Sequence, residues 1–312
     1  MSALPDSVTR RRMIRTLHFA PADDARKVAR LRTLPADVIV LDLEDAVAES
    51  AKDDARNAAA MALTTPSWRS GVAVRTNGLR TPHFDVDVDA VVIPGLELLV
   101  VPKIEEPDDL RAVEAVLTRM ESQRALAPPI GVIALIETAI GIANANRIAA
   151  EAPDRLERLV FGSVDFRANT GVSPSEGEPE LLYARSRIVV AAAIAGRGPA
   201  LDGPYEAVND NQGLRADCER SRRIGFGGRV TIHPGQLDTV NETYSLLDEE
   251  EASRLAAIVS AFEHALSAGV ASIRVGDTFV DYPVYREAHD RLELHRLASA
   301  PGRPGAGGHG GD

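Results

Sequence analysis

The sequence predicts a TIM (β/α)8 barrel with a C-terminal helical appendage. Eight short apolar runs of strand length recur along the chain, near residues 17, 40, 73, 100, 134, 162, 200 and 231. Each run except the third is followed by a clear helix candidate, and eight such repeats are typical of this barrel. The 312 residues accommodate a barrel of about 250 residues with an appendage. A doubly wound sheet is the alternative, but it favours a glycine-rich turn after an early strand, and none is present.

The eight runs are interpreted as parallel strands covered by helices, because they are continuously apolar rather than alternating. Helix candidates begin at Pro21, with acidic residues in the first turn, and at Pro107. The segment 85–93 is ambiguous, since its valines suggest a strand while the architecture requires a helix. The strand candidates are 16–20, 38–45, 72–75, 98–103, 129–139, 159–165, 200–203 and 229–234.

Three regions are expected along the chain. Residues 14–247 form the catalytic barrel, and residues 248–296 form a C-terminal segment that caps the barrel mouth, makes a subunit contact, or does both. This segment contains two helix candidates, 249–267 and 281–295, around an extended stretch. Residues 297–312 are predicted to be disordered because they are too rich in Gly and Pro to pack.

Composition excludes several classes of function. Hydrophobic residues make up 45% and charged residues 26% of the chain, as in globular proteins with an ample core. The net charge of -11 argues against nucleic acid and anionic membranes as partners. A single cysteine, Cys218, excludes an intrachain disulfide and fits a reducing cytoplasm. No long apolar stretch predicts a signal peptide or membrane span, so we expect the cytoplasm.

Polar residues gather where the predicted strands end, and a barrel aims such side chains at its catalytic face. For each of them the alternative is a cap on the following helix or a pairing with a neighbour. His233, followed by a proline, is equally compatible with a turn. The set is Asp42, Glu44, Arg75, Lys103, Glu137, Asp165, Asp202 and His233.

Two of these carboxylates suggest a metal site. Glu137 and Asp165 are 28 positions apart, roughly one strand-plus-helix repeat, so neighbouring strands would aim them at one pocket. Two oxygen ligands without a nearby His or Cys suit Mg²⁺ or Mn²⁺ better than zinc. The cation would accept the oxygens of a 2-oxo acid, and Arg75 would clamp a carboxylate or carbonyl oxygen. The pattern indicates metal-assisted carbon–carbon bond chemistry on a small acid.

Eight motifs in order resemble those of the citrate lyase β-subunit-like proteins, within the HpcH/HpaI aldolase/citrate lyase superfamily. The resemblance covers about residues 14–296. It implies a TIM barrel, a homo-oligomer (a trimer or a dimer of trimers) and Mg²⁺-dependent cleavage or formation of a carbon–carbon bond in an acyl-CoA thioester such as citryl-CoA, malyl-CoA or methylmalyl-CoA. The motifs are 41–47 (LDLEDAV), 74–77 (VRTN), 101–105 (VPKIE), 136–138 (IET), 161–166 (FGSVDF), 183–186 (YARS), 201–205 (LDGPY) and 232–234 (IHP).

The resemblance also implies roles. Glu137 and Asp165 fall on the metal ligands and Arg75 on the substrate arginine, and Lys103, Asp42 and Glu44 are further candidates for binding substrate. Asp281 precedes Pro283 as in an acid of the family that reaches the active site of the adjacent subunit, where it acts as general acid or base. Its alternative role is a helix N-cap. The chain departs from the family at 19–22, at 85–97 and at Asn169, which predicts a divergent member with its own acyl substrate.

Other functions remain open from the sequence. The same site would serve a malyl-CoA-type thioesterase, in which the thioester is hydrolysed without cleavage of the carbon–carbon bond. An aldolase on hydroxy-oxo acids without CoA is a second enzymatic alternative. A non-catalytic or carrier-protein-dependent subunit of a citrate lyase-like complex is the alternative from another class.

Overall fold

The computed structural model describes residues 13–65, 68–245, 247 and 249–299. The chain divides between Tyr244 and Ser245 into two compact units, which are described separately. None of the described helices combines the length and apolar character needed to cross a bilayer.

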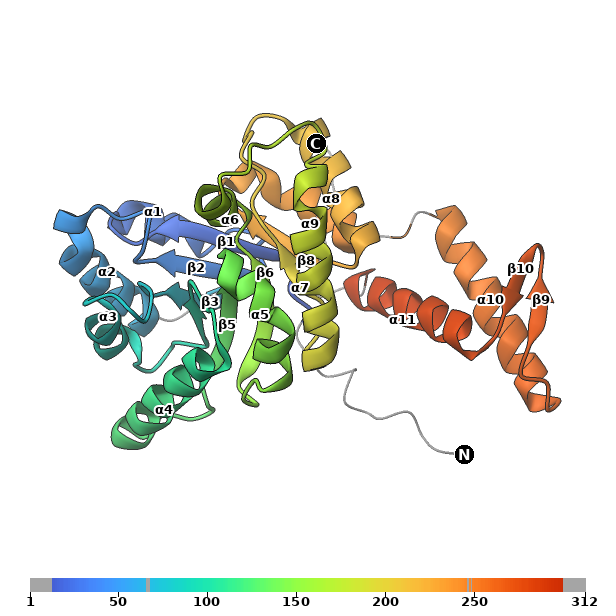
Figure 1. The fold of residues 1–312 in the computed structure, drawn as a ribbon, viewed down its shortest axis with the longest axis horizontal. Helices are drawn as coiled ribbons and strands as arrows, with labels where there is room; N and C mark the ends of the chain where they lie inside the picture. The colour runs from blue at the N-terminus through green and yellow to red at the C-terminus, as the bar shows by residue number, and fades with distance from the viewer. Residues whose placement is uncertain (1–12, 66–67, 246, 248, 300–312) are drawn as a thin grey trace, which may run out of the picture. The chain divides into compact units, whose positions relative to one another are not determined.

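The first unit is a closed barrel of eight parallel strands in sequence order, which confirms the predicted TIM barrel (Figure 1). The final strand pairs with the first, with Leu17 opposite Val230. The strands are β1 (Thr16–Pro21), β2 (Val38–Asp42), β3 (Gly71–Arg75), β4 (Leu98–Val101), β5 (Gly131–Ile136), β6 (Leu156–Phe161), β7 (Leu201–Asp202) and β8 (Gly228–Thr231).

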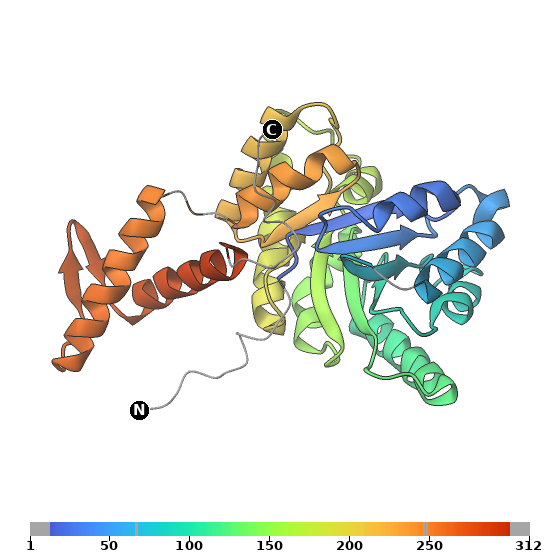
Figure 2. The same ribbon diagram turned by 180° about the vertical axis from the view of Figure 1, so that it is seen from behind.

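Helices surround this barrel, as both views show (Figure 1 and, from behind, Figure 2). They are α1 (Ala25–Leu31), α2 (Lys52–Thr64), α3 (Phe84–Val91), α4 (Pro107–Arg124), α5 (Ala139–Ala150), α6 (Ser163–Thr170), α7 (Leu182–Ala195), α8 (Asn211–Ile224) and α9 (Leu237–Ser245), with short 3-10 turns η1 (Glu49–Ala51), η2 (Pro179–Leu181) and η3 (Pro234–Gln236). The ambiguous segment after β3 is the helix α3, in which Phe84, Val88 and Val91 recur at helical spacing and are buried.

Alternation along the strands determines which side chains enter the barrel. On β2, Val38 and Val40 belong to the inner apolar cluster, whereas Ile39 and Leu41 belong to the cluster between strands and helices. The inward series continues at the carboxyl end of the strand to Asp42. The same alternation leads from Ala73 to Arg75 on β3. Polar side chains therefore follow the inner core at one end of the barrel.

The second unit packs two helices, α10 (Glu249–Ser267) and α11 (Tyr282–Ser299), with an antiparallel hairpin of β9 (Ile273–Val275) and β10 (Thr278–Val280). Phe262 is fully buried and stacks on Tyr285, with ring centroids 5.0 Å apart. Helix α11 extends to Ser299, so the first three residues of the predicted disordered tail are helical; the proline that ends helical propensity comes only at position 301. Residues 300–312 of that tail lie outside the described residues.

Candidate functional site

A cavity of about 380 Å³ opens at the carboxyl ends of the barrel strands. The alternation of the strands explains its polar lining, because Asp42, Arg75 and Glu137 continue the inward-facing positions of β2, β3 and β5. The cavity is lined by Phe19, Ala20, Pro21, Asp42, Asp45, Ala46, Arg75, Leu135, Glu137, Val160, Phe161, Gly162, Val164, Asp165, Pro204, Val230 and Ile232.

Arg75 is held by two acidic residues. Its Nε and Nη2 donate to the two oxygens of Asp42 at 2.7 and 2.5 Å, and its Nη1 lies 2.9 Å from Glu44 Oε2. Burial opposes the charge of Arg75, but the charges of Asp42 and Glu44 raise its pKa overall. Arg75 was expected to clamp a substrate oxygen, but the edge of the guanidinium that carries Nε and Nη2 faces Asp42. The remaining N–H groups of Arg75 are those that a ligand in the cavity can reach.

Glu44 joins this arginine to Lys103. Its Oε1 accepts from Lys103 Nζ at 2.7 Å, and burial raises the pKa of Glu44 despite its two cationic neighbours. Neither Glu44 nor Lys103 lines the cavity. Lys103 instead has a positive φ of 55°, and its backbone N–H donates to Glu137 Oε1 at 2.9 Å. An uncommon backbone conformation at this position thus aims an amide at a cavity carboxylate.

Glu137 is 1% exposed, and within the part of the chain that the structure describes its Oε2 has no hydrogen-bond partner. Burial, followed by the charge of Asp165, raises the pKa of Glu137 to about 8. Gly162 makes room for this side chain, since a Cβ there would overlap Glu137 Cβ and Oε2. A buried carboxylate oxygen left without a donor, beside a second carboxylate, is a place where a cation would be stabilised.

Asp165 reaches the cavity by a different route from the predicted one. Strand β6 ends at Phe161, and Asp165 lies in the first turn of α6 rather than at the end of a strand. The prediction was wrong about the element because Gly162 ends the strand early and acts as the N-cap of the helix. Burial and the charge of Asp45 raise the pKa of Asp165.

The donor set fits a hard divalent cation. Within the described residues no three His, Cys, Asp or Glu side chains form a complete ligand group. Glu137 and Asp165 would therefore supply two oxygens, and water or substrate would supply the others. Mg²⁺ is commonly bound in this way, through one or two carboxylates with several waters.

Three residues near the site escaped the sequence analysis. Phe19 packs its ring 5.0 Å from the Arg75 guanidinium, and Asp45 lines the cavity. Lys52, on α2, is buried, and its Nζ donates to Leu43 O, Glu44 O and Asn77 Oδ1 at 2.7, 2.7 and 2.9 Å. The inward alternation of β1 would have located Phe19, but nothing in the helical pattern of α2 distinguishes Lys52 from a surface lysine.

Two predicted site residues of the barrel, Asp202 and His233, do not line the cavity, and a third, Asp281, belongs to the other unit. Asp202 is fully buried and bonds to Arg185 Nε at 3.1 Å. His233 Nδ1 accepts from Gly235 N at the start of η3, the turn role that was left open. Asp281 belongs to the second unit, where its Oδ1 accepts from Val284 N at 3.3 Å in the first turn of α11. The N-cap alternative is therefore observed for Asp281.

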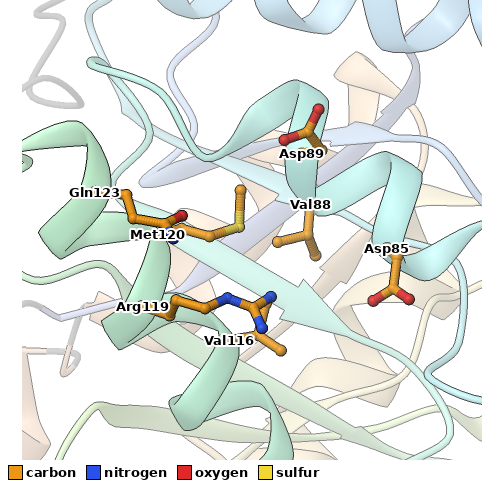
Figure 3. A pocket seen from close by; sticks show the side chains of 7 residues that line it. All are labelled: Asp85, Val88, Asp89, Val116, Arg119, Met120 and Gln123. Carbon is orange, nitrogen blue, oxygen red and sulfur yellow. The ribbon is translucent and has the colours of Figure 1, made fainter.

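A second cavity of about 340 Å³ lies on the outside of the barrel between α3 and α4. Figure 3 shows side chains of both helices approaching it from two sides. It shares no residue with the strand-end cavity and is lined by Asp85, Val88, Asp89, Val116, Arg119, Met120 and Gln123.

A comparison with family models matches residues 15–234 to HpcH/HpaI aldolase/citrate lyase. The chain belongs to this family. Citrate lyase subunit beta of Leuconostoc mesenteroides is 32% identical over 91% of this chain and 93% of its own length. Mouse mitochondrial citramalyl-CoA lyase is 29% identical over 90% of this chain and 85% of its own. The (3S)-malyl-CoA thioesterase of Cereibacter sphaeroides is 34% identical over 74% of this chain and 77% of its own.

Solved structures of similar proteins agree with the barrel. CitE from Mycobacterium tuberculosis in complex with magnesium, acetoacetate and coenzyme A has a TM-score of 0.76 and 28% identity, covering 91% of this chain and 99% of that one. The citrate lyase beta subunit of the same organism, complexed with oxaloacetate and magnesium, has a TM-score of 0.63 and 31% identity, covering 75% and 99%. The predicted family is confirmed, and relatives named as lyases support the expected enzyme class.

Proposed function

We propose that this chain is a Mg²⁺-dependent lyase. It would cleave a 3-hydroxyacyl-CoA thioester into an acyl-CoA and a 2-oxo acid, or form the thioester from these two compounds. The observation that carries the proposal is the unpartnered, buried Oε2 of Glu137 in the same cavity as Asp165. The names of relatives and the magnesium, coenzyme A and oxaloacetate in neighbouring structures support it. Mn²⁺ is a second suitable cation by its preference for oxygen ligands.

Glu137 and Asp165 would hold the metal, which supplies electrophilic polarisation of the oxo-acid oxygens when bound. The N–H of Lys103 fixes one oxygen of Glu137 and leaves the other for the metal. Asp42 and Glu44 fix the Arg75 guanidinium, so that its remaining N–H groups would stabilise negative charge on a substrate oxygen. Lys103 and Glu44 then act by positioning these groups.

In cleavage the hydroxyl proton passes to a base, the carbinol carbon becomes the carbonyl of the 2-oxo acid, and the electron pair of the broken carbon–carbon bond leaves an acyl-CoA enolate that must be protonated. The carboxylates that would bind the metal are unsuited to that step, and we assign it to Asp281, contributed by a neighbouring copy within a homotrimer or a dimer of trimers. Asp281→Asn separates proton transfer from capping, because Asn caps a helix nearly as well but cannot donate this proton. Wild-type turnover in Asp281→Asn would rule out the role.

The test of the proposal is product analysis with a panel of 3-hydroxyacyl-CoA thioesters in the presence of Mg²⁺. Equal amounts of acyl-CoA and 2-oxo acid are expected from at least one of them. Cleavage of hydroxy-oxo acids that is indifferent to CoA would instead support the aldolase. A stable complex with an acyl carrier and a transferase subunit would support the carrier-dependent alternative.

A thioesterase is the second candidate, since one relative of this chain is named as a (3S)-malyl-CoA thioesterase. The same carboxylates would serve it, but the products differ. Hydrolysis alone releases free CoA thiol and a hydroxy diacid, without a 2-oxo acid. A thiol reagent and an oxo-acid assay applied to the same reaction therefore distinguish the two outcomes.

A further inference from the structure

The strand-end cavity has two chemically different halves. Its charged residues come from one continuous sector of the barrel, β2 to β6 with their loops: Asp42, Asp45, Arg75, Glu137 and Asp165. Among the described residues, the sector formed by β7, β8 and β1 contributes apolar side chains alone: Phe19, Ala20, Pro21, Pro204, Val230 and Ile232.

The cavity has little positive charge to offer an additional anion. Among the described residues that line it, Arg75 is the one cation, and two carboxylates already hold it. Lys103 is not part of the lining, and its ammonium is paired with Glu44 and lies 3.9 Å from Asp45. Arg229, on β8, points away from the lining and pairs with Asp217 at 2.6 Å.

Four carboxylates and one guanidinium line the cavity, so a bound divalent cation leaves it with a net negative charge. One substrate carboxylate would be accommodated by the metal and by the remaining N–H groups of Arg75. A second carboxylate, carried on a substituent of the carbinol carbon, would meet either the apolar sector or further carboxylates. Burying an unpaired charge is strongly unfavourable, and like charges repel.

We infer that the acid fragment of this site is a 2-oxo acid with a single carboxylate, whose remaining substituent is hydrogen or a small alkyl group facing β7, β8 and β1. The inference rests on the proposed function, since it specifies one fragment of that reaction. It excludes dicarboxylic 2-oxo acids as good substrates or products. Charge, rather than size, makes the distinction.

The kinetic test compares citramalyl-CoA with citryl-CoA, which differ by a methyl against a carboxymethyl group on the carbinol carbon. We expect kcat/KM to be at least tenfold higher for citramalyl-CoA. Calorimetric titration of the Mg²⁺-loaded protein with pyruvate and with fresh oxaloacetate should show the same order of affinity. Equal or better cleavage of citryl-CoA, or equal or tighter binding of oxaloacetate, would overturn the inference.

A variant that adds a positive charge to the lining tests whether the lack of a second cation causes the discrimination against dicarboxylic acids. Ile232 is 41% exposed where β8 meets the cavity, so Ile232→Lys can supply the missing cation without burying it. This variant should raise the citryl-CoA to citramalyl-CoA ratio of kcat/KM by tenfold or more. Val190→Lys, on the exposed surface of α7 and outside the cavity, is the matched charge control and should keep the wild-type ratio.

The outcomes separate the two proposals. If none of the thioesters is cleaved, the proposed function fails, and the comparison of pyruvate with oxaloacetate still decides the inference. If wild-type protein discriminates but Ile232→Lys changes neither the kinetic ratio nor the affinity for oxaloacetate, the missing cation is not the cause and the inference is overturned.

Discussion

Lys52→Met tests how the loops beneath the site are held. The Lys52 ammonium is buried and donates three hydrogen bonds, two to the carbonyls of Leu43 and Glu44 and one to Asn77 Oδ1. Methionine has a similar length but donates none of them. The variant therefore removes the ammonium that ties the loop after β2 to the loop after β3, leaves the bond from Asn77 Nδ2 to Leu43 O in place, and keeps most of the volume.

The expected loss follows from which acceptors keep another donor. Leu43 O still accepts from Asn77 Nδ2 at 3.0 Å, and Glu44 O from Val47 N at 3.1 Å. Asn77 Oδ1 loses its ammonium donor. Hydrogen bonds to charged groups contribute about 1.5 to 3 kcal/mol each, and removing the ammonium also removes its desolvation cost, so we expect a net loss of about 3 kcal/mol. For a unit of this size that lowers Tm by about 6 to 12 °C.

Thermal unfolding followed by circular dichroism measures this change. Lys27→Met is the matched control, because Lys27 is an exposed lysine on α1 and its loss should change stability by less than about 0.5 kcal/mol. Activity should also fall, through kcat, because the backbone carrying Glu44 is released while the cavity lining is unchanged. An unchanged Tm and kcat in Lys52→Met would refute the role assigned to this lysine.

Three further substitutions address the site and its surroundings. Gly162→Ala should abolish activity and the rise in Tm caused by Mg²⁺, because the new Cβ displaces the Glu137 carboxylate; a normal response to Mg²⁺ would contradict this. Arg75→Lys should lower kcat/KM by at least a hundredfold, about 2.7 kcal/mol. A single ammonium cannot replace both the two hydrogen bonds of the Arg75 guanidinium to Asp42 and its ion pair with Glu44. Near-normal kinetics would show that the guanidinium geometry is unnecessary. Burial, followed by the charge of His233, lowers the pKa of His18 to about 4. Between these two pKa values the unfolded chain, in which His18 has a pKa near 6.5, binds more protons than the folded protein. The contribution of neutral His18 to the free energy of unfolding is therefore fully present above pH 6.5 and falls by about 3 kcal/mol as the pH decreases to 4. His18→Gln should reduce that slope in Tm measurements between pH 7.5 and 5, and identical slopes would contradict it.

The barrel could be predicted from the sequence because its signal is local and repeated. Strands buried on both faces appear as continuous apolar runs, and a polar residue where such a run stops falls on one end of the barrel. That reasoning located Arg75 and Glu137 correctly relative to β3 and β5. It misplaced the element of Asp165, since the apolar run continues through Val164 although Gly162 had already ended the strand.

The pairings within the site could not be predicted in the same way. The sequence indicates that Asp42, Glu44, Arg75 and Lys103 lie at one end of the barrel, but which cation faces which carboxylate depends on backbone detail. The positive φ of Lys103 turns its amide toward Glu137 and leaves its ammonium with Glu44. Lys52 illustrates a second limit, because only the folded loops reveal that three oxygens converge on it.

The most direct test of the central claim is the product balance of one reaction with and without metal. Purified protein is mixed with citramalyl-CoA or malyl-CoA, in Mg²⁺ or in excess EDTA, and acyl-CoA and 2-oxo acid are measured together. We predict equal amounts of both products with Mg²⁺, and neither with EDTA or in Glu137→Ala that retains the wild-type circular dichroism spectrum. Product formation that persists in EDTA or in Glu137→Ala, or thioester loss without a 2-oxo acid, would contradict the account.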